Sequence, residues 1–346
     1  MTDEVPTTTQ PASPGGTPGE VADAAGASDA SDASDAPDAP DAPDAPGTSG
    51  TSGTSDAEFG LLVAPVTTEE QSVKVSRAGR NLPAAIVVGL TLGALVAASL
   101  FVRRDLFLWL ATAWVCVGVW ELTRALRGSG VHVPLVPSLV GAVSMMFSAF
   151  YGQGQALAVC FALTCVAILI WRFADGVVGA ARDVAGGMFV AAYPSLLAAF
   201  SSLLLAPSDG AWRIFTYVGV TVASDIGGYA VGATQGRHPM APTISPKKSW
   251  EGFGGSVVAC CVVAVLDVTL TLHGAWWVGL VLGVLTAVVA TVGDLVESTI
   301  KRDLGIKDMS NILPGHGGVM DRLDSQVMVA PVAWAVLAIL VPVAIH

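Results

Sequence analysis

Long apolar stretches alternate with short polar connections from about residue 84 to the end of the chain. A helix needs about 20 mostly apolar residues to cross the hydrocarbon core of a bilayer. The stretches that meet or approach this length are 84–102, 105–123, 133–151, 155–171, 186–206, 211–233, 253–272, 275–297 and 326–345. The pattern therefore predicts an all-α, polytopic membrane protein with about nine transmembrane helices.

Composition favours this class over a soluble one. A chain of 346 residues would suffice for about two soluble domains. However, 53% of the residues are hydrophobic and only 13% are charged, which is typical of a chain whose main solvent is lipid. The five cysteines lie in apolar stretches without the spacing of a metal or redox site, so we interpret them as small apolar side chains.

The first 80 residues have a different composition. Residues 1–70 contain 14 Asp and Glu and no Lys or Arg, and "SDASDAPDAPDAPDAP" is followed by Gly-Thr-Ser units. Such a segment buries too little apolar surface to offset the entropy lost on ordering. We therefore expect a disordered tail at 1–80, N-terminal transmembrane helices at 81–210 and a catalytic C-terminal transmembrane region at 211–346. The tail is expected to be a solvated extension without a catalytic role, and a docking arm for a partner is the alternative.

Basic residues predict the orientation of the helices. Nine crossings place the two ends of the chain on opposite sides, and Lys and Arg concentrate on the cytoplasmic side of membrane proteins. With the N-terminus inside, 14 of the 17 Lys and Arg lie in inner segments, and Arg103, Arg104 and Arg213 lie outside. We therefore predict a multi-pass protein of the cell (plasma) membrane. Its N-terminus and the connections that follow 211–233 and 275–297 would face the cytoplasm.

A carboxylate lies within the stretch 211–233. Asp225, in "ASDIGGYAVG", follows Arg213 by twelve residues, which is about 18 Å along a helix. An ionisable group at that depth is costly and is by default a functional candidate. The alternative is an Asp that packs the helix through an ion pair with a neighbouring Arg or Lys. Gly227 and Gly228 would let another backbone or a ligand approach closely.

A basic connection follows this stretch. "ISPKKSWEGFGG" places Lys247 and Lys248 between the hydroxyls of Ser245 and Ser249. Ammonium groups and hydroxyls suit phosphate binding, and Ser249 is a candidate N-cap of the next helix. For the two lysines the alternative is a topological signal alone.

The densest group of charges lies between the last two apolar stretches. If the helix continues past residue 297, four polar side chains share one broad face: Asp294, Glu297, Ser298 and Lys301. Asp321 and Asp324 repeat the i, i+3 spacing before the final stretch. Carboxylates on two facing helix ends suit Mg²⁺, which prefers oxygen ligands.

Basic side chains accompany these carboxylates. Lys301, Arg302, Lys307 and Arg322 could bind phosphate oxygens beside a metal. Acids for a metal together with bases for phosphate predict a site for nucleotidyl or phosphoryl transfer, and simple loop ion pairs are the alternative. His316 could be a general acid or base, a phosphate ligand or a hinge residue.

The C-terminal sequence resembles the signature of the phosphatidate cytidylyltransferases, or CDP-diacylglycerol synthases. The matching residues are Ser298-x-Ile300-Lys301-Arg302, Lys307-Asp308, Pro314-x-His316-Gly317-Gly318 and Asp321-Arg322-x-Asp324. "SPKKSWEG" is similar to an upstream motif of that family. "SDIGGY" is a looser match, because Ile226 stands where a small hydroxyl residue is usual. The resemblance covers about residues 80–346 and excludes the tail.

The resemblance implies a reaction of CTP with phosphatidic acid that yields CDP-diacylglycerol and pyrophosphate. It also implies Mg²⁺, a second, monovalent cation (K⁺) near it, a homodimer in the lipid bilayer and no nucleic acid partner. On this hypothesis the catalytic residues are Asp225, Asp294, Lys301, His316 and Asp321. The metal ligands are Asp225, Asp294, Glu297, Asp321 and Asp324. Substrate is bound by Ser245, Lys247, Lys248, Ser249, Ser298, Arg302, Lys307, Asp308, Gly317, Gly318 and Arg322.

Two other functions remain open at this point. A CTP-dependent lipid-alcohol kinase would also use CTP and many helices, but it would transfer the γ-phosphoryl group and release CDP. A polytopic transporter would also place carboxylates within helices. The sequence has no paired halves or repeated broken helices of the kind found in many transporters.

Overall fold

The computed structural model describes residues 82–310, 312 and 317–343. The predicted tail at 1–80 and His316 therefore lie outside the described residues. The division of the membrane region between residues 210 and 211 stays a prediction.

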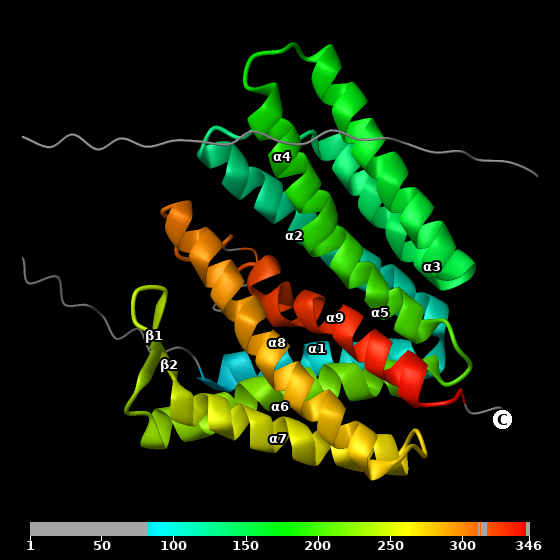
Figure 1. The fold of residues 1–346 in the computed structure, drawn as a ribbon, viewed down its shortest axis with the longest axis vertical. Helices are drawn as coiled ribbons and strands as arrows, with labels where there is room; N and C mark the ends of the chain where they lie inside the picture. The colour runs from blue at the N-terminus through cyan, green and yellow to red at the C-terminus, as the bar shows by residue number, and fades with distance from the viewer. Residues whose placement is uncertain (1–81, 311, 313–316, 344–346) are drawn as a thin grey trace, which may run out of the picture. The chain divides into compact units, whose positions relative to one another are not determined.

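Helices make up nearly all of the described chain (Figure 1). They are α1 (Leu82–Val102), α2 (Arg104–Gly128), α3 (Leu135–Ala174), α4 (Ala180–Val190), the π-helix η1 (Ala191–Leu196), α5 (Leu197–Leu205), α6 (Gly210–Gln235), α7 (Trp250–Leu270), α8 (Trp276–Asp303) and α9 (Met320–Leu340). Two short strands, β1 (Pro239–Ala241) and β2 (Ser245–Ser249), pair antiparallel. In the described part, seven helical segments are long and apolar enough to cross a membrane. The prediction of an all-α, polytopic membrane protein is thus confirmed.

The single helix α3 corresponds to two of the predicted crossings. Its 40 residues are interrupted at Gln153, whose backbone (φ 58°, ψ −158°) is not helical. A straight helix would place Gly141 and Thr164 about 35 Å apart. Instead, a Cβ on Gly141 would meet Thr164 Cγ2 at 2.2 Å, so the two arms of α3 run back along each other (Figure 1). The missing side chain at Gly141 allows this close packing.

The helices α4, η1 and α5 form one continuous rod with a widened turn in the middle. Pro194 lies in this turn. It has no N–H to donate to Val190, and its ring would clash with that carbonyl in a regular α-helix. The chain widens to a π-turn, and the Ser195 hydroxyl donates to Val190 O at 3.2 Å. Proline and π-turns are recognised causes of such irregularity.

The connections between helices gather at two ends of the bundle. At one end, Arg104 donates to Pro207 O at 2.5 Å, and Arg213 donates to Leu337 O at 2.8 Å. At the other end, the His132 amide donates to Asp183 Oδ1 at 2.7 Å. The α1–α2 and α5–α6 connections thus share one end with the end of α9, and the α2–α3 connection shares the other end with the start of α4.

Glycines bring α6 and α7 together. A Cβ on Gly227 would lie 2.6 Å from Gly255 O, and one on Gly228 would lie 2.6 Å from Ser256 Oγ. The expectation that Gly227 and Gly228 allow the close approach of another backbone is therefore confirmed. This contact fixes the position of Asp225 on α6 relative to the strands that precede α7.

The buried Arg213 joins the start of α6 to the end of α9. Its Nε donates to Asp209 Oδ1 at 2.8 Å, and its two terminal nitrogens donate to Leu337 O and Val341 O at 2.8 and 2.9 Å. The residue is 2% exposed. Leu337 O also accepts from the Val341 amide, whereas the carbonyl of Val341, the residue that follows α9, has no partner within the helix. The guanidinium binds both carbonyls and stabilises the contact between α6 and α9.

We expect Arg213→Met to lower the stability of the protein by about 3–5 kcal/mol, because it leaves Asp209 as an uncompensated buried charge. The loss should appear as a lower midpoint of thermal unfolding in detergent. A double variant, Arg213→Met with Asp209→Asn, should regain part of the loss because it removes the stranded charge. An unchanged midpoint in the single variant would contradict the role of Arg213.

Candidate active site

A cavity of about 260 Å³ with several charged side chains in its lining opens between α6, β2, α7 and α8. Asp225 and Tyr229 line it from α6, Lys247 and Lys248 from β2, and Asp294 from α8. The structure therefore brings Asp225 together with the two lysines of the basic connection and with Asp294, the first residue of the dense group of charges. A site with carboxylates and ammonium groups at the end of an apolar bundle can hold an anionic ligand together with a cation.

The lysine-bearing segment is a β-hairpin instead of the predicted loop. Ser249 ends β2 and caps α7, since the Gly252 amide donates to Ser249 Oγ at 3.1 Å. The predicted N-cap is thus confirmed. Glu251 in the first turn of α7 accepts from the amides of Arg237 and His238 at 3.1 and 3.2 Å, which ties the start of the hairpin to the helix.

Lys248 connects the hairpin to α8. Its ammonium donates to Asp294 Oδ2 at 2.5 Å, and both side chains are about one quarter exposed. Lys247, by contrast, is exposed. A topological signal alone would not require a lysine to turn into the cavity, so the contact favours a chemical role for Lys248.

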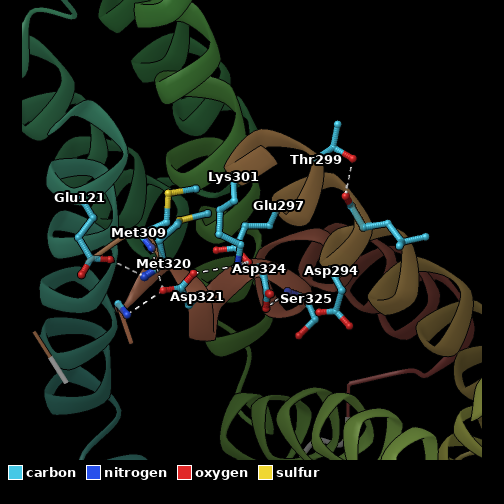
Figure 2. Close-up of polar contacts among 12 residues, drawn as sticks. Glu121, Asp294, Glu297, Thr299, Lys301, Met309, Met320, Asp321, Asp324 and Ser325 are labelled. Carbon is cyan, nitrogen blue, oxygen red and sulfur yellow. Dashed lines mark hydrogen bonds and ion pairs between the residues drawn. The ribbon is translucent and has the colours of Figure 1, made fainter. Parts of the chain in front are cut away.

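Lys301 connects α8 to α9. Its ammonium lies 2.7 Å from Glu297 Oε2 and 2.9 Å from Asp321 Oδ1 (Figure 2). Glu297 and Lys301 are one helical turn apart, as the spacing predicts. One cation thus neutralises carboxylates on two helices and sets the distance between them.

Asp321 organises the chain segment that precedes α9. Its Oδ2 accepts from the amides of Gly318 at 2.8 Å and Met309 at 3.0 Å, while Oδ1 accepts from Lys301. Gly317 has a left-handed backbone (φ 81°), which favours glycine. A Cβ on Gly318 would lie 3.1 Å from Asp321 Oδ2. These glycines therefore lie against Asp321, and their predicted contact with substrate stays a prediction.

Four carboxylates from three helices form the centre of the site. Asp225 interacts electrostatically with Asp294 and Asp324, and Asp324 in turn interacts with Glu297. No ion pair within 4.0 Å in the described part of the chain involves Asp225. This disfavours the alternative in which Asp225 only packs its helix against a basic partner. Lys248 and Arg322 are the basic side chains that interact with Asp225, so carboxylates outnumber bases in this cluster.

The remaining predicted residues lie around this centre. Arg302 is exposed and Ser298 is half-buried on α8, and Lys307 and Asp308 are exposed on the segment after it. Ser245 is half-buried in β2. Arg322 follows Asp321 directly and interacts with Asp225. The structure thus keeps the predicted bases on the same side of the bundle as the carboxylates, and their contact with substrate stays a prediction.

The donor chemistry of the cluster fits a hard cation. All of its side-chain donors are carboxylate oxygens, and Glu297 Oε1 is buried without a hydrogen-bond partner among the described residues. Within residues 82–310, 312 and 317–343, however, no three His, Cys, Asp or Glu side chains are already gathered as a metal site. The Mg²⁺ site predicted from the sequence, with Asp225, Asp294 and Asp321 as ligands and Glu297 and Asp324 beside them, therefore stays a proposal. Asp321 lies outside the cluster of four, and its two oxygens accept from Lys301 and from two backbone amides.

Glu121 is a site residue that the sequence reasoning missed. It lies on α2 with 0% exposure and accepts a hydrogen bond from the Met320 amide at the start of α9 (Figure 2). Its other oxygen accepts from the Val319 amide. The available signal was a carboxylate within the apolar stretch 105–123, the same signal that selected Asp225. Its partners are almost 200 residues away, and no spacing rule could connect them.

Comparisons with known proteins place the chain in a family. A model of the cytidylyltransferase family matches residues 83–340. The phosphatidate cytidylyltransferase of Mycobacterium leprae is 41% identical over 287 residues, which is 78% of this chain and 92% of that protein. The proteins of the same name from Mycobacterium bovis and Mycobacterium tuberculosis are 42% identical over 289 residues, or 79% of this chain and 93% and 87% of theirs. The chain therefore belongs to the cytidylyltransferase family.

Proposed function

We propose that the protein is a phosphatidate cytidylyltransferase, which converts CTP and phosphatidic acid to CDP-diacylglycerol and pyrophosphate. The observation that carries the proposal is the cavity lined by the charged side chains of Asp225, Lys248 and Asp294 at the end of an apolar helix bundle. A soluble nucleotide and a lipid headgroup can meet there. The names of the mycobacterial relatives support the same reaction.

In this reaction an oxygen of the phosphatidate phosphate attacks the α-phosphorus of CTP. A new P–O bond forms, and the bond between the α-phosphorus and the oxygen that bridges to the β-phosphate breaks, so pyrophosphate leaves with that oxygen. The nucleophile is already an anion and needs no strong base. Catalysis therefore depends on alignment and on compensation of phosphate charge.

The chain supplies groups for both tasks. Lys247 and Lys248 would hold the triphosphate, and Lys301 keeps Glu297 and Asp321 at a fixed separation. Arg302, Lys307 and Arg322 would bind the remaining phosphate oxygens. When bound, Mg²⁺ would add positive charge at the phosphate oxygens. His316 lies outside the described residues, so its role in proton transfer or binding stays a prediction.

The proposal includes an orientation. We infer that the protein lies in the plasma membrane with the cavity and the N-terminus on the cytoplasmic side, where CTP is available. The distribution of Lys and Arg, 14 inside and 3 outside, supports this orientation. The homodimer and the monovalent cation K⁺ are also part of the proposal, and they rest on the family resemblance alone.

The function can be tested with the purified protein in detergent, phosphatidic acid, CTP and Mg²⁺. Pyrophosphate and CDP-diacylglycerol should appear in equal amounts. Release of CDP without a nucleotide-bearing lipid would indicate the lipid-alcohol kinase class instead. Neither product from folded protein would leave the transporter class as the better explanation.

Asp294→Asn should abolish turnover without unfolding the protein. The substitution keeps the shape of the side chain but removes the charge that pairs with Lys248 and that is available to a metal. Activity would be measured over a range of Mg²⁺ concentrations, with the unfolding midpoint as a control. Near-normal turnover at saturating Mg²⁺ would exclude Asp294 from the metal site.

The two adjacent lysines should differ in their effects. Lys248→Met should lower kcat/KM for CTP about 10- to 100-fold, because a charged hydrogen bond in a part-buried site is worth about 1.5–3 kcal/mol. Lys247→Met is the matched control, since Lys247 is exposed. It should raise KM for CTP by a smaller factor and leave kcat unchanged. Equal losses in the two variants would contradict the distinction drawn from the structure.

A further inference from the structure

Glu121 uses both carboxylate oxygens at the start of another helix. Oε1 accepts from the Val319 amide at 3.0 Å, and Oε2 accepts from the Met320 amide at 2.7 Å. The Ser310 hydroxyl donates to Oε1 as well. With 0% exposure, the carboxylate has no access to water, so these donors are what stabilise its charge.

The contact replaces a cap that α9 lacks. Val319 occupies the N-cap position, and in the described structure no hydrogen bond from its side chain caps the helix. The first amides of a helix have no partner within it, and its N-terminus favours negative charge. Glu121 provides both a partner and a charge, from a helix that is distant in sequence.

The first turn of α9, which Glu121 caps, contains the site residue Asp321. Asp321 follows Met320 directly, and its Oδ1 receives the Lys301 ammonium at 2.9 Å. A Cβ on Gly318 would lie 2.9 Å from Glu121 Oε2 and 3.1 Å from Asp321 Oδ2. The turn is therefore held between two carboxylates, Glu121 on one side and Asp321 on the other (Figure 2).

The third donor to Glu121, the Ser310 hydroxyl, connects Glu121 to the segment after α8 as well. Ser310 follows Met309, whose amide donates to Asp321 Oδ2 at 3.0 Å. Glu121 and Asp321 thus bind neighbouring residues of that segment as well as the start of α9. A substitution at Glu121 therefore weakens the contacts that hold both of these segments. Both segments position Asp321, and Asp321 in turn positions Lys301.

We propose that Glu121 is a positioning residue for cytidylyl transfer, which fixes the first turn of α9 so that Asp321 and Lys301 keep their places in the site. The inference rests on the proposed function for its kinetic consequence. Its structural part, the immobilisation of the amides of Val319 and Met320, does not depend on which reaction the protein catalyses.

The test combines Glu121→Gln with two measurements on the full chain in detergent. Glutamine keeps the size of the side chain but removes the charge and presents an NH₂ group to backbone donors. We expect kcat to fall about 10- to 100-fold, as for other residues that orient a site through a second residue. KM for CTP and for phosphatidic acid should change less than about threefold, because the interaction is required in the transition state.

Hydrogen exchange without substrates supplies the second readout. The amides of Val319 and Met320 should exchange faster in Glu121→Gln, whereas the amides of α6 and α7 should be unchanged. Thr112→Val is the matched control, because Thr112 is a buried polar residue of α2 whose hydroxyl bonds only its own helix, at Leu108 O. It should leave both exchange and kcat as in the unmodified protein.

A second variant keeps the test valid if Glu121→Gln does not fold. Ser310→Ala removes one donor to the same carboxylate from a half-buried position, and it should lower kcat severalfold and speed exchange at Val319. Unchanged exchange in either folded variant, or faster exchange with an unchanged kcat, would overturn the proposal. If the unmodified protein makes no CDP-diacylglycerol, the proposed function fails while the exchange result still decides the role of Glu121 in the fold.

Discussion

A charge inside an apolar helix bundle must have a partner, because water cannot reach it. Three of the buried charges in the described chain meet that requirement by joining one helix to another, and two of them join helices that are distant in sequence. Arg172 pairs with Asp183 at 2.9 Å, Arg213 binds the end of α9, and Glu121 binds its start. α9 is therefore fixed at both ends by charges on other helices, and the position of the site follows from these contacts.

The candidate active site departs from this rule of pairing. Lys248 compensates Asp294, and Lys301 is shared by Glu297 and Asp321, but Asp225 and Asp324 add further negative charge to the same region. Such an excess is unfavourable in a structural core and is useful where a cation binds. The paired charges at the ends of the bundle stabilise the fold, whereas the excess negative charge in the cavity is available to a cation. The same residue types therefore have different roles in these two places.

The sequence predicted the features that depend on local pattern. The length of apolar runs gave the helices, and the i, i+3 and i, i+4 spacing placed Glu297 and Lys301 together. It could not give contacts between distant segments, such as Glu121 with Met320, because these depend on how the helices pack. The hairpin of β1 and β2 and the widened turn at Pro194 were also missed, since apolar periodicity carries little information about short strands or a single altered turn.

The widened turn affects the register of the rod that contains it. Asp183, Gly187 and Val190 are buried before the turn, and Ala198, Ser202 and Leu205 are buried after it. A π-turn closes its hydrogen bond from residue i to residue i+5 instead of i+4, so it contains one residue more than an α-turn. The turn thus accommodates the equivalent of a one-residue insertion without rotating the buried face. If η1 adopted regular α-helical geometry at the present chain length, everything from Ala198 onward would rotate by about 100°, and the contact of Phe200 with Trp334 on α9 would be lost. Pro194 prevents that change, so one proline preserves the alignment of α5 with the helix that carries the site.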